Sequence, residues 1–159
     1  MIIRTNVKPE DIENVREIVT STRFFHDYEI DVAIELVRET LNKGSDSGYN
    51  FIFVELDNKI VAYSCFGLIP CTQSSYDLYW IAVHNNYRNK GIGKKLLAQT
   101  EKFILDAGGT AVYAETSSQE LYEPTRRFYI FNNYNEEARL KDYYKQGDDK
   151  IVYSKRLRY

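Results

Sequence analysis

One stretch decides the fold of this chain: Asp77-Leu-Tyr-Trp-Ile-Ala-Val-His-Asn-Asn-Tyr-Arg-Asn-Lys-Gly-Ile-Gly-Lys-Lys-Leu-Leu-Ala98. Its first part, Leu78 to Val83, is apolar, aromatic and β-branched, which is typical of a buried strand. Polar and basic residues follow from His84 to Lys90, and the loop closes on two glycines. Beyond them, apolar positions recur every three or four residues, which predicts a helix buried on one face. This apolar stripe consists of Ile92, Leu96, Thr100, Phe103 and Ala107, with Leu97 and Ile104 beside them.

The loop before this helix has the properties of an anion site. The first amides of a helix have no intrahelical acceptor, and the helix dipole places partial positive charge there. Glycines at positions 91 and 93 let the backbone approach a ligand, so a phosphate or pyrophosphate is expected. The loop is neither a P-loop nor a dinucleotide-binding motif, because no Gly-Lys-Ser/Thr follows and position 96 is leucine. Further attraction for an anion comes from Arg88, Lys90, Lys94 and Lys95.

The bulk composition fits a single globular domain that spans residues 1–159. A net charge of -2 argues against a general nucleic-acid or membrane binder. The two cysteines have no zinc-ligand spacing, so no metal site is expected, and they fit a reducing cytoplasm. No signal peptide and no apolar run of about 20 residues is present, so a cytoplasmic location is expected.

The rest of the chain alternates between strand and helix patterns. Proline and acidic residues favour a helix start after position 8, and turn residues separate the later strands. Gly108 and Gly109 end the central helix, and Asn133 ends the last one in a left-handed conformation. The expected elements are strand 2–7, a helix after Pro9, a helix from about Ile30 to the loop 44–48, strands 50–56, 60–69 and 75–83, the helix from Ile92, strand 110–116, helix 122–132, and strands 135–144 and 150–157.

The segment Arg88-Asn89-Lys90-Gly91-Ile92-Gly93 resembles the pyrophosphate loop of the GNAT N-acetyltransferase superfamily. The segment from Thr125 to Tyr134 is similar to the second signature of that superfamily, with asparagine at 133 and tyrosine at 134 where glycine and phenylalanine are usual. The order of elements is also that of the GNAT topology. The resemblance therefore implies an α/β (α+β) fold: a mixed, mostly antiparallel sheet of about seven strands with four helices, splayed at the central strands.

The resemblance also implies acetyl-CoA as the coenzyme. Its pantetheine arm would lie between strands 77–83 and 110–116, where the backbone of Ile81, Ala82 and Val83 would bond to it. An amide aimed at the thioester oxygen would stabilise the developing oxyanion. Tyr122 is a weaker candidate for a coenzyme contact. The pyrophosphate would lie on Arg88, Asn89, Lys90, Gly91, Ile92, Gly93 and Lys94.

Transfer to an amine needs a base, because a primary amine arrives as an ammonium ion. Asp77 is one candidate, since it lies four residues before Ile81 and residues four apart share a face of a regular strand. Glu115, near the end of the facing strand, is the other, and either carboxylate could simply be a solvated strand residue. Tyr129 matches the superfamily tyrosine that protonates the leaving thiolate, although a core tyrosine on a helix is the alternative among 14 tyrosines.

Acceptor specificity is expected in the segment that interrupts the first two helices. Phe24, Phe25 and Tyr28 could form an apolar wall and His26 could help to read a cation, or the segment could simply pack the two helices together. We therefore predict acetyl transfer to a primary amine of a small molecule, by direct attack in a ternary complex. Acetylation of a protein lysine or N-terminus, a non-catalytic acyl-CoA-binding module, and a nucleotide-binding or interaction domain are the alternatives. Exposed strands in the terminal hairpin are compatible with a homodimer.

Overall fold

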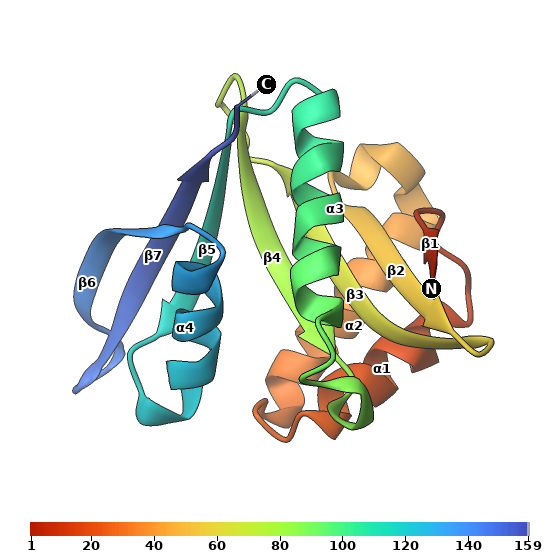
Figure 1. The fold of residues 1–159 in the computed structure, drawn as a ribbon, viewed down its shortest axis with the longest axis horizontal. Helices are drawn as coiled ribbons and strands as arrows, with labels where there is room; N and C mark the ends of the chain where they lie inside the picture. Colours follow the sequence, from red (N-terminus) through yellow and green to blue (C-terminus); the bar gives the residue numbers. More distant parts are fainter. Residues whose placement is uncertain (159) are drawn as a thin grey trace. The chain divides into compact units, whose positions relative to one another are not determined.

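The computed structural model describes residues 1–158, which form four α-helices and seven strands (Figure 1). The order of helices and strands is the predicted one. The elements are β1 (Ile2–Arg4), α1 (Asp11–Ser21), α2 (Asp27–Lys43), β2 (Asn50–Leu56), β3 (Lys59–Leu68), β4 (Ser75–Val83), α3 (Ile92–Asp106), β5 (Ala111–Ser117), α4 (Glu123–Phe131), β6 (Asn135–Lys145) and β7 (Asp148–Arg156).

All seven strands belong to one mixed sheet, in the order β1-β2-β3-β4-β5-β7-β6. The pairs β1–β2, β2–β3, β5–β7 and β6–β7 are antiparallel, whereas β4 and β5 are parallel. The parallel register joins three residue pairs, from Ser75 with Ala111 to Asp77 with Tyr113. The predicted fold class, a mostly antiparallel GNAT-type sheet with four helices, is confirmed.

The chain divides into two compact units, which we describe separately. The first unit consists of residues 1–67 and 78–103, and the second of residues 68–77 and 104–159. The boundary therefore passes through β4 and through α3. The sequence-based expectation of a single domain over residues 1–159 stays a prediction.

In the first unit, helices cover both faces of β3, because successive side chains of a strand point to opposite faces. Tyr63 and Cys65 are fully buried in a cluster with apolar residues of α1 and α2. The intervening Ser64 hydroxyl instead shares a hydrogen bond of 2.8 Å with the hydroxyl of Thr100 on α3. The core of this unit thus lies on both sides of its strands.

In the second unit, α4 packs on one face of β7. Tyr129 of α4 stacks on Tyr153 of β7 with ring centroids 5.7 Å apart, and Tyr134 lies 5.3 Å from Tyr129. Strand β6 ends the sheet, and every one of its residues is exposed. Hence the α4 side of β7 is buried and β6 forms a solvent-exposed edge.

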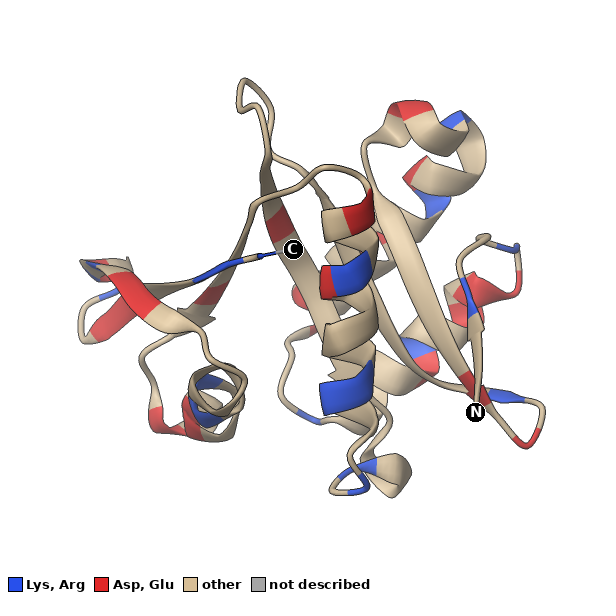
Figure 2. Ribbon diagram, turned by 45° about the horizontal axis from the view of Figure 1, so that its top comes forward, with Lys and Arg blue, Asp and Glu red and all other residues tan. Residues whose placement is uncertain are grey.

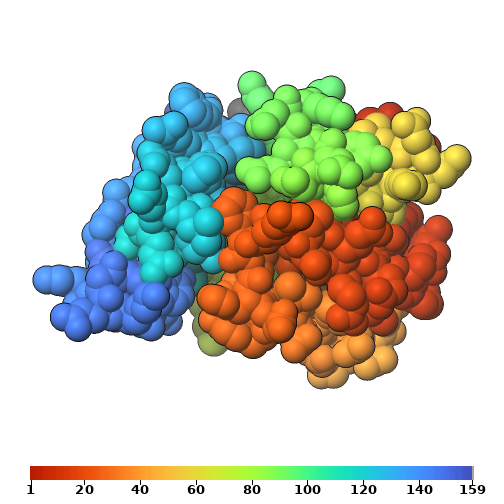
Figure 3. All heavy atoms as spheres, turned by 90° about the horizontal axis from the view of Figure 1, so that it is seen from below, coloured from red at the N-terminus to blue at the C-terminus, as the bar shows by residue number. Residues whose placement is uncertain are grey.

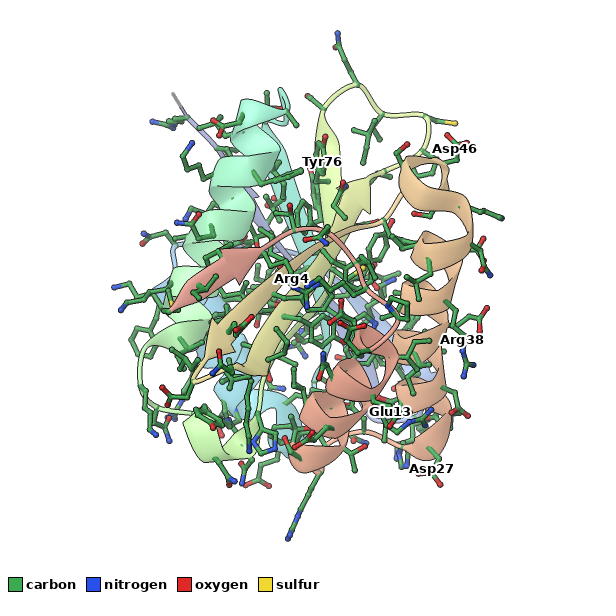
Figure 4. The ribbon with its side chains drawn as sticks, turned by 90° about the vertical axis from the view of Figure 1, so that its right-hand side faces the viewer. Arg4, Glu13, Asp27, Arg38, Asp46 and Tyr76 are labelled. Carbon is green, nitrogen blue, oxygen red and sulfur yellow. The ribbon has the colours of Figure 1, made fainter. Side chains whose placement is uncertain are left out.

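Two elements near the N-terminus differ from the predicted bounds. β1 ends at Arg4 and not at Val7, and the Arg4 guanidinium lies 2.7 Å from the Asp11 carboxylate at the start of α1. Figure 4 labels Arg4. α2 begins at Asp27, about one turn earlier than predicted, with the amide of Ile30 donating to the His26 carbonyl. Both differences arise from contacts that apolar periodicity does not report.

Fewer residues of α3 and β4 are buried than the apolar patterns predicted. Phe103 is 36% exposed and Ala107 is exposed, so the buried stripe of α3 ends at Ile104. On β4, Leu78 and Ala82 are buried, but Tyr79 is 38% exposed. The strand is therefore not buried throughout, as an uninterrupted apolar run had suggested. Across residues 1–158, no helix has both the length and the apolar composition that crossing a membrane requires.

Candidate functional site

The basic loop before α3 belongs to the first unit and has a defined backbone. Asn89 and Gly91 both adopt left-handed conformations, with φ of 61° and 77°. The amide of Lys95 donates to the Gly91 carbonyl over 3.1 Å, so helical hydrogen bonding starts at Gly91. The amides of the first helical turn therefore lack intrahelical acceptors, as an anion site requires. Gly93 does not have a positive φ, so only the first glycine supplies the conformational freedom expected of both.

The predicted ligands in this loop differ in what they can offer a phosphate. Asn89, Lys90 and Lys94 are exposed, and Figure 2 shows basic residues on the loop and on the first part of α3. The Lys90 ammonium lies 3.4 Å from the Asn86 carbonyl and so remains on the loop. Ile92 is only 6% exposed because its side chain belongs to the core, so only its backbone amide can donate a hydrogen bond to a phosphate.

The end of α1 holds the start of the loop. The amide of Asn85 donates to the Ser21 hydroxyl over 3.0 Å, and the Arg88 guanidinium lies 5.5 Å above the ring of Phe24. Figure 3 shows these two segments of the first unit side by side on its surface. The predicted acceptor segment and the predicted coenzyme loop are thus in direct contact through Phe24 and Arg88.

The other three predicted acceptor residues differ in exposure: Phe25 is half-buried, whereas His26 and Tyr28 are exposed. Phe25 packs edge-on against Trp80, with ring centroids 4.9 Å apart, and joins the core of the first unit. His26 and Tyr28 are exposed and stack on each other, with ring centroids 5.3 Å apart and an angle of 13° between the rings. Phe25 therefore has the packing role that the sequence left open, while His26 and Tyr28 remain available to a ligand.

The backbone candidates lie at the end of β4. Ile81 and Val83 are half-buried and Ala82 is 8% exposed. Just before them, Tyr79 contacts Tyr49 and its neighbour Trp80 contacts Phe25, and both partners pack against the same core cluster. Two successive side chains thus turn toward the same part of the first unit, so β4 is not a regular strand at this point.

Both candidate bases belong to the second unit and lie on one face of its sheet. Asp77 pairs in register with Tyr113, two residues before Glu115 on β5, so the two carboxylates share a face. Lys150 of β7 joins them there, because its ammonium lies 2.9 Å from the Glu115 carboxylate. The ring of Tyr143 covers the same ammonium at 4.5 Å from its centroid.

The two carboxylates have different surroundings. Glu115 is engaged by Lys150, whereas Asp77 has no ion pair within residues 1–158. Burial raises the pKa of Asp77 above its ordinary value, the charge of Glu115 raises it further, and Lys150 offsets only part of this. Asp77 is therefore the carboxylate whose affinity for a proton is increased.

Tyr129 lies on the opposite face of this sheet, beneath α4. It is 5% exposed, and burial raises the pKa of its hydroxyl, so the hydroxyl stays protonated at neutral pH. Tyr129 stacks on Tyr153 of β7. Tyr153 points away from the face that carries Asp77 and Glu115, because neighbouring positions of a strand point to opposite faces. The predicted acid and the predicted bases thus lie on opposite faces of the second unit. Tyr122, the weaker coenzyme candidate, is half-buried at the residue before α4.

Lys150 and Tyr143 were not among the predicted site residues. Both lie in the terminal hairpin, in the stretch 142–150, which resembles a prokaryotic branch of the superfamily but indicates no role for either side chain. Their link to Glu115 depends on the register of β5 with β7, in which Ser117 opposes Lys150 and Glu115 opposes Val152. Knowledge of that pairing would have placed Lys150 diagonally opposite Glu115.

Comparisons with known proteins identify the family and the fold of the chain. The sequence model of the acetyltransferase (GNAT) family matches residues 12–130. A crystallised protein from Desulfovibrio desulfuricans, assigned to the GNAT family of acetyltransferases, is 44% identical, with 98% of each chain covered and a TM-score of 0.96. No curated protein matches the chain at a significant level of sequence similarity.

More distant structures share the fold alone. An aminoglycoside 6'-N-acetyltransferase in complex with coenzyme A is 19% identical, with 100% of this chain and 98% of that chain covered and a TM-score of 0.78. The ribosomal-protein-S18-alanine N-acetyltransferase of Escherichia coli is 18% identical, with 99% and 94% covered and a TM-score of 0.77. One of these proteins acts on a small molecule and the other on a protein, so the fold does not distinguish the two classes of acceptor.

The chain belongs to the GNAT family of acetyltransferases. It is accordingly an N-acetyltransferase that uses acetyl-CoA, as coenzyme A-bound members of the fold do. The loop from Arg88 to Lys94 suits the pyrophosphate of this coenzyme, because left-handed residues, free helix amides and exposed lysines converge there. Within residues 1–158, no group of three or more His, Cys, Asp or Glu side chains is arranged to hold a metal ion.

Proposed function

We propose that the chain transfers the acetyl group of acetyl-CoA to a primary amine of a small molecule, by direct attack in a ternary complex. The observation that carries this proposal is Asp77: a half-buried carboxylate whose pKa is raised and which has no ion pair within residues 1–158. Such a group can take a proton from an incoming ammonium ion. A module that only binds acyl-CoA would have no use for it.

The roles of the other residues follow from their chemistry, with Asp77 acting from one face of the sheet of the second unit and Tyr129 from the other. The bound coenzyme supplies an activated acetyl thioester. Asp77 takes one proton from the acceptor ammonium at a carboxylate oxygen, which leaves a neutral amine as the nucleophile. The C–N bond then forms and the C–S bond breaks; Tyr129, which burial keeps protonated at neutral pH, donates its hydroxyl proton to the departing thiolate. The nitrogen loses its second proton to water, and Tyr129 regains a proton from water. Arg88 and the first amides of α3 hold the pyrophosphate.

The segment between α1 and α2 favours a small acceptor over a long peptide. Phe24 is held by Arg88 and Phe25 by Trp80, so the aromatic side chains do not form an open apolar trough. His26 and Tyr28 remain as a compact exposed pair. A surface of this size suits an amine with one polar or aromatic group.

Thiol release from acetyl-CoA tests this proposal directly. The assay uses a panel of small amines, amino acids, peptides with free N-termini and lysine peptides. Turnover with small amines supports the proposal, and turnover with peptides alone would replace it by protein acetylation. Coenzyme A binding without turnover for any acceptor would indicate a non-catalytic module.

The role of the loop is tested by Gly91→Glu. A carboxylate at this position repels phosphate, and its Cβ is strained at the observed φ of 77°. Coenzyme A binding, measured by titration calorimetry, should weaken at least tenfold, which is about 1.4 kcal/mol. Gly108→Glu is the matched control, since Gly108 has φ of 89° and equally open surroundings but follows the C-terminal end of α3. Equal losses in the two variants would assign the effect to backbone strain.

We also propose that the chain can associate as a homodimer through the exposed edge strand β6. Light scattering at several protein concentrations measures the mass directly. A mass of about 18.7 kDa at every concentration would mean that the chain is a monomer.

A further inference from the structure

The ion pair between Lys150 and Glu115 lies beside the proposed base but has no part in the proton transfer. It belongs entirely to the second unit, where β5 and β7 are paired over seven residue positions. The Lys150 side chain is only 15% exposed, and its ammonium is held both by the Glu115 carboxylate at 2.9 Å and by the ring of Tyr143. A lysine fixed in this way by two partners has a defined position, unlike a typical surface lysine.

The charged groups that act on Asp77 come from β5, which pairs with β4, and from β7, the next strand of the sheet. Glu115 of β5 contributes a negative charge and Lys150 of β7 a positive one. From the hairpin, Tyr143 and Tyr144 surround the ion pair, with their rings 5.1 Å apart and nearly perpendicular. Asp148 is buried and accepts a hydrogen bond from the Ser117 hydroxyl.

We propose that Lys150 is a positioning residue that makes Asp77, and not Glu115, the base of the reaction. By binding the Glu115 carboxylate, Lys150 occupies the second candidate base and partly neutralises it. Asp77 then stands alone as the carboxylate that can accept a proton from the acceptor: R–NH3⁺ and Asp77–COO⁻ become R–NH2 and Asp77–COOH. This inference rests on the proposed function, because it assumes an amine acceptor.

The proposal predicts opposite effects for the two members of the ion pair. Removing the positive charge in Lys150→Met leaves two unneutralised carboxylates close together, so the proton affinity of Asp77 should rise. Removing the negative charge in Glu115→Gln should lower it. A purely structural role for the ion pair would not produce shifts of opposite sign.

The first experiment needs no acceptor. Carbon-13 NMR follows the titration of the Asp77 carboxyl in the free protein, for the wild type and four variants. The midpoint should rise by about one pH unit in Lys150→Met and fall by about one unit in Glu115→Gln. Lys150→Arg should restore the wild-type midpoint, because it keeps the charge. Lys141→Met, which removes an exposed lysine of the same hairpin, should leave the midpoint unchanged.

The second experiment measures the pH dependence of kcat/KM with any amine that supports turnover. If Asp77 is the base, activity is lost as the pH falls through its pKa, and this acidic limb should move with the NMR midpoint in each variant. Unchanged NMR midpoints in both Lys150→Met and Glu115→Gln would overturn the inference and leave the proposed function intact. NMR shifts without a matching change in the acidic limb would overturn the assignment of Asp77 as the base, and the inference with it.

Discussion

Tyr129 shows at the scale of a single residue how burial changes the chemistry of a side chain. It is enclosed by Tyr134, Tyr153 and Phe128, and this burial raises the pKa of its hydroxyl. The raised pKa keeps the hydroxyl protonated at neutral pH but makes it a weaker acid than an ordinary tyrosine. The surroundings make the residue part of the core, which is one of the two roles considered from the sequence, and the acid role is a proposal.

Replacing Tyr129 by phenylalanine should separate these roles. The ring and its packing remain while the proton is lost, so kcat should fall by about 10²- to 10⁴-fold with little change in coenzyme A affinity. Thiol release measures the first quantity and calorimetry the second. Tyr153→Phe is the control, because it removes a hydroxyl from the adjacent, equally buried ring. Full turnover in Tyr129→Phe would exclude the residue as the acid.

At the scale of elements, one buried ion pair connects the first strand to the first helix. Asp11 is fully buried at the start of α1, and accepts hydrogen bonds from Arg4, from the amide of Lys8 and from Asn14. Burial alone would raise the pKa of Asp11, but these hydrogen bonds outweigh it and lower the pKa below its ordinary value. The contact fixes the connection between β1 and α1.

Asp11→Asn should therefore lower the free energy of unfolding by about 2 to 3 kcal/mol at neutral pH. A carboxyl whose pKa is lowered by folding stabilises the protein above its unfolded pKa, and this contribution is lost as the pH falls through the folded value. The difference between wild type and variant should thus stay constant above about pH 5 and shrink below about pH 4. Urea unfolding across this range measures it. Asp27→Asn, an exposed aspartate in the first turn of α2, should change stability far less.

At the scale of the whole molecule, the question is whether the two compact units unfold together. Their boundary cuts β4 after Asp77 and α3 after Phe103, so each unit contains part of a strand and part of a helix that the other unit completes. Loss of one unit alone would truncate both elements and remove their hydrogen bonds. Connectivity alone therefore favours a single cooperative transition.

Two probes can test this, because the chain has one tryptophan. Trp80 reports on the first unit by fluorescence, and the tyrosine cluster around Tyr129 reports on the second by near-ultraviolet circular dichroism. Equal urea midpoints for both signals are expected for a single domain. Coenzyme A at about 100 times its dissociation constant should raise both midpoints together, because it adds about 2.7 kcal/mol to the free energy of unfolding. Separate midpoints would show that the units are independent domains.

Local patterns in the sequence were sufficient to predict the order of elements and the coenzyme loop. Strands β2 and β4 have the predicted bounds, because turn residues flank runs of apolar residues there. Asn133, with φ of 67°, ends the last helix region in the left-handed conformation expected of it. The basic loop could be predicted from the sequence, because the groups proposed to bind the pyrophosphate are consecutive residues and helix amides. Such features depend on neighbours within a few positions, which the sequence displays.

What the sequence could not decide were the relations between residues far apart in the chain. The sequence left both Asp77 and Glu115 as candidate bases, and only strand register placed Lys150, 35 positions beyond Glu115, on the second carboxylate. The early start of α2, the exposure of Phe103 and the packing of Phe25 on Trp80 also depend on partners from other elements. Apolar periodicity reports which side chains can be buried, whereas the charge and burial of a site residue depend on the groups that the fold brings against it. The sequence by itself thus determined the family, because its motifs are local, and the tertiary structure decided which of the two carboxylates is paired with Lys150.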